Sequence, residues 1–74
     1  MSKTTEQLID ILKAGGSISL DITARPYAHL LKLAEASANT GTLLILRNSQ
    51  DRASQQLIEL SKYNKKNNIV FSID

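Results

Sequence analysis

Apolar side chains recur with two alternating spacings along this chain, and that alternation constrains the fold more than any other feature. Three stretches place apolar residues at intervals of three and four, which is typical of helices. A short stretch of strand character follows each of them, so the predicted order is αβαβαβ. Strands joined through a helix run parallel in one sheet. We therefore expect a single two-layer α/β domain over residues 1–74, with a three-stranded parallel sheet and the helices on one face.

Local signals define the first helix. Thr4 and Gln7 have the spacing of a capping box, in which each side chain binds a free backbone N–H at the helix start. The apolar residues that follow predict the inner face of this helix: Leu8, Ile11 and Leu12, with Ile9 beside them. We expect the helix to end at Gly15–Gly16, because glycine adopts the left-handed conformation cheaply.

The second and third helices have comparable signals. Pro26 predicts the start of the second helix, since its missing N–H costs nothing in the first turn. Gly41 predicts its end. Asn48 or Ser49 is the expected cap of the third helix. The apolar stripe of that third helix is predicted to be Ala53, Leu57 and Leu60.

The three strands differ in a way that predicts their order. Residues 17–23 alternate between polar and apolar side chains, as in a strand with one solvated face. Residues 42–48 contain the uninterrupted apolar run Leu43–Leu46, which indicates burial in the middle of a sheet. Residues 69–73 form the last strand, with Ile69, Phe71 and Ile73 as its inner stripe. We therefore predict the order 1-2-3, and the alternative order 2-1-3 would place Asp21 beneath a helix in mid-sheet.

Self-similarity links these segments with a period of about 25 residues. Superposing the strands aligns Ile18 with Leu43 and Ile69. Two interpretations remain open: three true helix-strand repeats, or the ordinary regularity of an α/β fold.

The central strand leaves two large aliphatic side chains on the face away from the helices. These are either Leu43 and Ile45 or Leu44 and Leu46. Exposed apolar patches of this kind mark contacts with other chains. Taking the second possibility, the candidate protein-interface residues are Ser19, Asp21, Leu44, Leu46, Val70 and Ser72. The sequence thus predicts a non-enzymatic interaction or assembly module, self-associating or bound to another protein through the sheet face or its edge strands, unless the N-terminal segment or a loop folds over the patch.

Chemical groups for other functions are scarce. The chain has no Cys and one His, His29, so we expect no zinc site, no catalytic site and no cofactor. No apolar run approaches the length of a membrane span. Without cysteine or an apolar N-terminal segment, we expect a soluble cytoplasmic protein that does not engage membranes.

The net charge of +2 arises entirely in residues 38–74. An alternative function is therefore that of a small nucleic-acid-binding accessory protein, in which cations neutralise phosphates. Its candidate residues are Arg47, Arg52, Lys62, Lys65 and Lys66. A simpler interpretation is that the lysines favour the negative end of the third helix and keep the following loop solvated.

Overall fold

The computed structural model describes residues 3–73. Within them, helices and strands alternate along the chain and two short 3-10 turns follow β1 and β2. The elements are α1 (Thr5–Lys13), β1 (Ile18–Asp21), the turn Ile22–Ala24, α2 (Tyr27–Thr40), β2 (Leu44–Arg47), the turn Ser49–Asp51, α3 (Ser54–Ser61) and β3 (Ile69–Phe71).

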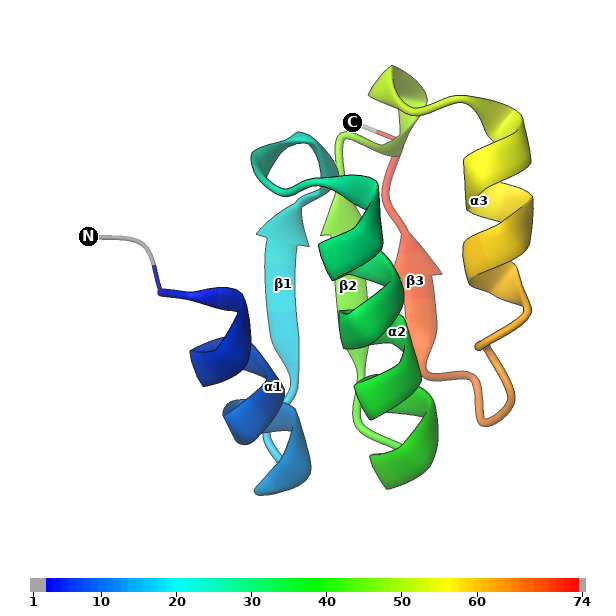
Figure 1. Ribbon diagram of the computed structural model, residues 1–74. Coiled ribbons are helices and arrows are strands. Elements are labelled where there is room, and N and C mark those ends of the chain that lie inside the picture. Colours follow the sequence, from blue (N-terminus) through cyan, green and yellow to red (C-terminus); the bar gives the residue numbers. More distant parts are fainter. Residues whose placement is uncertain (1–2, 74) are drawn as a thin grey trace.

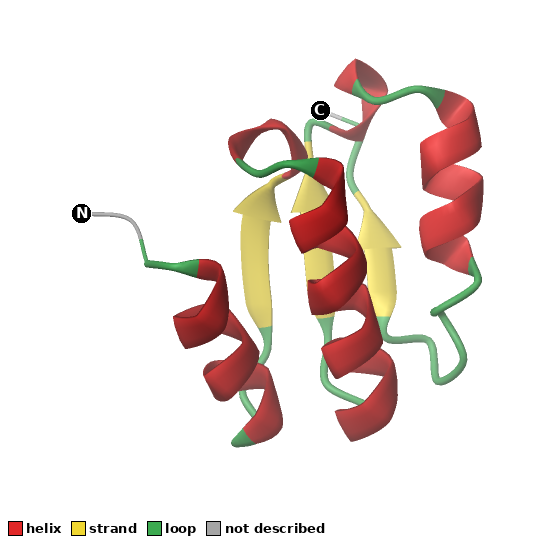
Figure 2. Ribbon diagram, in the orientation of Figure 1, coloured by secondary structure: helices red, strands yellow, loops and turns green. Residues whose placement is uncertain are grey.

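The helices form one layer and the sheet the other, and all three helices lie on the same side of the sheet (Figures 1 and 2). The strands are parallel in the order β1-β2-β3, so the predicted fold is confirmed and the order 2-1-3 is wrong. Ile18, Leu44 and Ile69 stand side by side in this register. The sequence superposition, which matched Leu43 to Ile18, was therefore one residue out of register in β2.

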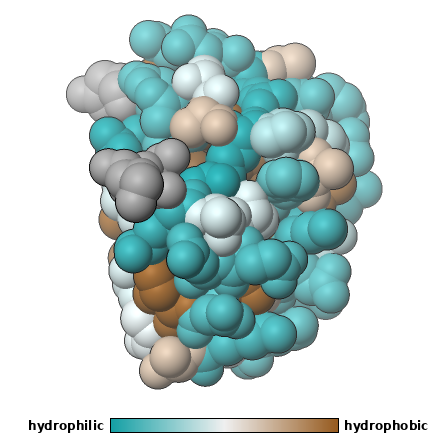
Figure 3. Space-filling view, turned by 60° about the vertical axis from the view of Figure 1, so that its left-hand side comes forward, coloured by the Kyte–Doolittle hydropathy of each residue, from teal (hydrophilic) through white to brown (hydrophobic). Residues whose placement is uncertain are grey.

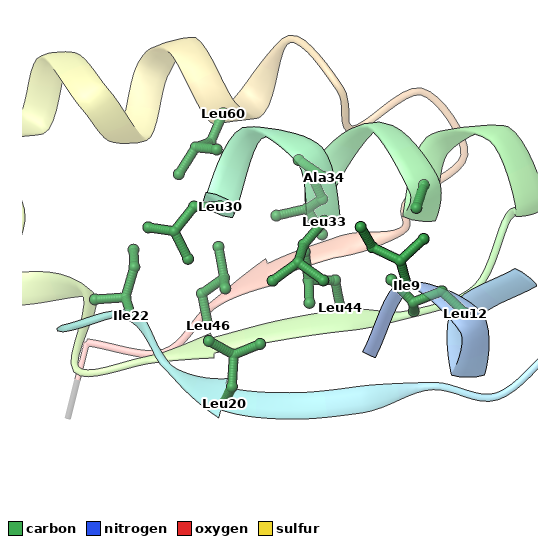
Figure 4. Close-up of a cluster of buried hydrophobic side chains, with 12 residues drawn as sticks. Ile9, Leu12, Leu20, Ile22, Leu30, Leu33, Ala34, Leu44, Leu46 and Leu60 are labelled. Carbon is green, nitrogen blue, oxygen red and sulfur yellow. The ribbon is translucent and has the colours of Figure 1, made fainter. Parts of the chain in front are cut away.

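The core lies between the two layers. Leu44 and Leu46 project from β2 toward α2 and meet Leu30 and Leu33 there (Figure 4). All four side chains are fully buried, and so is Leu60 of α3. Each buried side chain of this size contributes about 1.5–3 kcal/mol. The central strand is therefore held mainly through Leu44 and Leu46.

Helix α1 begins as predicted and faces the core differently. The capping box is complete, because Thr4 Oγ1 accepts the N–H of Gln7 at 3.2 Å and Gln7 Oε1 accepts the N–H of Thr4 at 3.0 Å. The fully buried apolar side chain is Leu12, with Ile9 close behind. Leu8 and Ile11 lie only half-buried, which corrects the predicted inner face. Their spacing places them on the flank of the helix.

The boundaries of α2 agree with the sequence. Pro26 precedes the first helical residue in extended conformation, and Gly41 closes the helix in the left-handed region at φ 75°. The N–H of Gly41 donates to Ser37 O at 2.8 Å. A side chain at this φ would be strained, so glycine is required here.

The predicted cap of α3 is wrong. The helix begins after Ala53, which provides no side-chain cap. Asn48 and Ser49 instead bind backward to the strands: Asn48 Nδ2 donates to Asp21 Oδ2 at 2.7 Å, and Ser49 Oγ donates to Leu46 O at 2.7 Å. The 3-10 turn Ser49–Asp51 lies between β2 and the start of α3.

The last strand is shorter than predicted. It ends at Phe71, whose side chain is half-buried against the core, and Ile69 is buried. Ile73 retains 56% of its surface, so the inner stripe does not continue to that residue.

Candidate interaction surface

One face of the sheet has no helix over it in the described residues (Figure 1). The apolar side chains on this face are Ile45 of β2 and Val70 of β3. Ser19, Ile45 and Val70 are register neighbours, so they form one row across this open face. Val70 keeps 42% of its surface exposed, Ser19 is exposed and Ile45 is half-buried. Parallel sheets are usually covered on both faces. This parallel sheet therefore departs from the usual arrangement, because one of its faces is uncovered in the described residues.

Two of the predicted interface residues lie on the wrong face. Leu44 and Leu46 are fully buried under α2 and are not available to a partner. Val70 pairs with Ile45, not with either leucine, so the side chain that β2 presents to the open face is the half-buried Ile45. The uninterrupted apolar run is compatible with either pair of β2 side chains on the open face. The register with β1 and β3 shows that Leu44 and Leu46 point toward the helices.

Three of the predicted interface residues lie on the open face. Ser19 and Val70 are exposed there, and Asp21 is half-buried at its margin. Ser72, which follows β3 in the chain, is also half-buried. Arg47, which had been placed among nucleic-acid candidates, is the register partner of Asp21 and is exposed. An acidic and a basic side chain therefore border the same end of the face.

Asp21 is held by a local hydrogen-bond network. Its Oδ1 accepts the Thr23 hydroxyl and, at 2.8 Å, the Thr23 N–H, and its Oδ2 accepts Asn48 Nδ2 at 2.7 Å. The bonds from Thr23, then the bond from Asn48, with a smaller effect of the nearby Arg47 charge, hold the pKa of Asp21 below its ordinary value of 3.8. The margin of the open face therefore carries a fixed negative charge at neutral pH.

The two edges of the sheet differ. Ile69 N, at the outer edge of β3, donates to Asn64 Oδ1 at 3.0 Å, so a side chain of the preceding loop occupies that backbone donor. Along residues 3–73, β1 pairs with β2 alone, and its outer edge has no such cap. Unpaired edges are templates for another strand. Asn64 thus occupies one backbone donor at the β3 edge, whereas no side chain caps the β1 edge in the described residues.

The basic candidates are not gathered in one patch. Arg52 is committed to the fold, because its Nη2 donates to Arg25 O at 2.7 Å and to Ile22 O at 3.2 Å. Arg47 lies at the carboxyl end of β2, whereas the remaining lysines precede β3 at the opposite end of the sheet. These lysines are Lys62, Lys65 and Lys66. The five residues therefore form no continuous basic surface that a phosphate backbone could follow.

A hollow of about 420 Å³ lies between the beginnings of α1 and α2. His29 Nδ1 is 3.1 Å from the hydroxyl of Thr5, which is buried and accepts a hydrogen bond from Arg25 Nη1 at 3.0 Å. Glu6 also lines the hollow, and residues 3–73 contain no hydrogen bond between Glu6 and His29. A histidine that acts as a general base is normally oriented by a carboxylate that accepts a hydrogen bond from its ring. The observed bonds instead connect α1 to the start of α2.

Open α/β sheets bind ligands where the strand order reverses direction. The order β1-β2-β3 contains no reversal, so this sheet has no such crevice. In the described part of the chain, no group of three or more His, Asp or Glu side chains is arranged to hold a metal ion. None of its helices combines the length and apolar character needed to cross a membrane.

Comparison with protein-family models, with curated protein sequences and with solved structures gave no match for this chain.

Proposed function

We propose that this chain is a non-enzymatic assembly module that self-associates through the open side of its sheet, by the face around Ile45 and Val70 or by the free edge of β1. The observation that carries the proposal is the uncovered face of a parallel sheet, on which Val70 of β3 is 42% exposed beside the half-buried Ile45 of β2. Apolar surface bordered by polar side chains is typical of contacts between chains.

The composition of the open side favours a second copy as the occupant. Asp21 and Arg47 border the face with opposite charges, so the same surface offers both partners of an intermolecular ion pair. A twofold interface requires this kind of self-complementarity. A domain of 74 residues also buries a smaller fraction of its surface than a larger one and gains more from association.

The dimensions of the face set a limit on this contact. Three strands about 4.8 Å apart, with a rise of about 3.3 Å per residue, give a face of roughly 200 Å² in projection. A stable interface buries about 800 Å² on each partner. The face alone therefore supports weak association, and a tighter assembly needs the edge as well.

Light scattering after size exclusion, from micromolar to millimolar chain, tests the proposal. We expect the mass to rise to at least twice the 8.1 kDa of one chain. The double variant Ser19→Pro with Val70→Lys, which blocks both edge and face, should remain folded by circular dichroism and be monomeric. The control is Ile58→Lys, because Ile58 is 56% exposed on α3, away from the sheet.

Two results would overturn the proposal. One is a wild-type chain that stays monomeric at millimolar concentration. The other is a double variant that still associates while Ile58→Lys dissociates, since α3 would then be the contact surface.

A further inference from the structure

The backbone of β1 presents a defined set of groups to its free edge. Ile18 N donates to Leu43 O at 3.0 Å, which directs the backbone of Ile18 toward β2. Successive residues of a strand point their N–H and C=O to opposite edges, so Leu20 also faces β2. The backbones of Ser17, Ser19 and Asp21 therefore point outward. No proline interrupts this segment.

An apolar flank accompanies this edge on the helix side. Leu8 and Ile11 of α1 are half-buried, and Ile11 Cγ2 would lie 2.8 Å from a Cβ placed on Gly16, just before β1. Ile18, two residues after Gly16, is also half-buried. Figure 3, with the N-terminal side turned forward, shows apolar surface on this side of the molecule among hydrophilic side chains. A strand added at the edge of β1 would bring a second layer against this flank.

We propose that two copies of this chain pair antiparallel through β1 about a twofold axis at Ser19, forming one six-stranded sheet. This inference rests on the proposed self-association and identifies its first contact. A twofold axis through an edge strand requires antiparallel pairing, because the axis reverses the strand direction. The contact at the β3 edge is disfavoured, because Asn64 already occupies the N–H of Ile69.

The side chains select the register. With the axis at Ser19, Ser17 of one copy faces Asp21 of the other, and Ile18 faces Leu20. In this register the outward backbone groups of the two copies lie opposite one another. The side chains of Ile18 and Leu20 meet on the helix side of the sheet, and no two like charges are brought together. An axis at Asp21 would bring two carboxylates together, which is destabilising. An axis at Leu20 would run the pairing into the 3-10 turn after β1.

The paired arrangement would change the surface on both sides of the sheet. The flanks of the two α1 helices, with Leu8 and Ile11, would meet in front of the new sheet and lose water. The open face would become twice as wide, so the apolar row at Ile45 and Val70 would form part of a larger continuous surface.

Single-cysteine variants test the register directly, because the native chain has no Cys. At an antiparallel hydrogen-bonded pair the Cα atoms are about 5.5 Å apart. Disulfides form across roughly 4.4–6.8 Å. Ser19→Cys should therefore give a disulfide-linked dimer rapidly under mild oxidation. Ser17→Cys is the matched control, since the two copies of that residue would be roughly 13 Å apart along the strands.

The outcomes separate this inference from the proposed function. Fast cross-linking of Ser19→Cys with slow cross-linking of Ser17→Cys supports the pairing. A wild-type dimer whose Ser19→Cys variant cross-links no faster than Ser17→Cys overturns the pairing and leaves self-association standing. A wild-type monomer at millimolar concentration overturns both.

Amide hydrogen exchange of the unmodified chain provides a second measurement that does not depend on the variants folding. The Ser19 N–H should gain protection as the chain concentration rises, while the Leu20 N–H, directed toward β2, stays protected throughout. A Ser19 N–H that exchanges equally fast across a dimerisation measured by light scattering would also overturn the pairing.

Discussion

Replacing Asn68 by alanine should remove about 2–4 kcal/mol from the free energy of unfolding. The Asn68 side chain is 1% exposed and lies just before β3. Its Nδ2 donates to Ser37 Oγ at 2.9 Å and to Tyr63 O at 3.1 Å, while its Oδ1 accepts Lys66 N at 3.0 Å. One amide therefore joins α2, the end of α3 and the loop leading to the last strand.

The magnitude follows from what the substitution leaves behind. Each of the three hydrogen bonds contributes about 0.5–1.5 kcal/mol, and a buried group without a partner costs about 1–3 kcal/mol. Lys66 is exposed, so water can replace the lost bond to its N–H. Tyr63 O is the principal group left without this donor. A domain of this length has about 4–11 kcal/mol in total, so the loss is a large fraction.

Urea denaturation followed by circular dichroism measures this effect, since the chain has no Trp for fluorescence. Asn64→Ala is the matched control, because Asn64 is exposed and its side chain accepts one hydrogen bond, from Ile69 N at 3.0 Å. We expect the control to lose about 0.5–1.5 kcal/mol. Equal losses for the two variants would refute the assignment of Asn68 as a central connection.

Two further predictions concern the core and the margin of the open face. Leu46→Ala should cost about 3–5 kcal/mol and Phe71→Ala less, because Leu46 is fully buried and Phe71 only half-buried; chemical denaturation yielding the reverse order would contradict the packing described. Since the folded state lowers the pKa of Asp21, its ionised form stabilises the fold above the ordinary value of 3.8, and this contribution is lost as pH falls through the lowered pKa. The thermal midpoint of the wild type should therefore fall more steeply than that of Asp21→Asn between pH 4 and pH 2, and parallel curves would refute the effect.

The features predicted correctly from the sequence depend on neighbouring residues or on an overall pattern of burial. The box formed by Thr4 and Gln7 needs only a spacing of three, and Gly41 needs only its own φ. The strand order followed from the contrast between the fully apolar run of β2 and the half-polar β1. These features can be predicted from the sequence because they do not require the position of a particular distant residue to be known.

The errors arose where the outcome depends on a distant partner. Leu44 and Ile45 are equally apolar, and the register with β1 and β3 shows which of them points toward the helices. Asn48 is a good helix cap by type, but the carboxylate of Asp21 engages its side chain. Asn68 lies in the loop before β3, and its burial is not predicted by the sequence because its partner Ser37 lies far away along the chain. Ser19, Asp21 and Val70 were therefore placed on the correct face, whereas Leu44 and Leu46 were not.

Chemical-shift mapping by NMR during dilution tests the central claim most directly. As the chain goes from millimolar to micromolar concentration, we expect shifts to change at amides on the open side of the sheet, above all Ser19, Ile45 and Val70, and to remain constant on the outer surface of α3 at Ile58. Spectra that do not change with concentration, or changes confined to α3, would contradict self-association through the sheet.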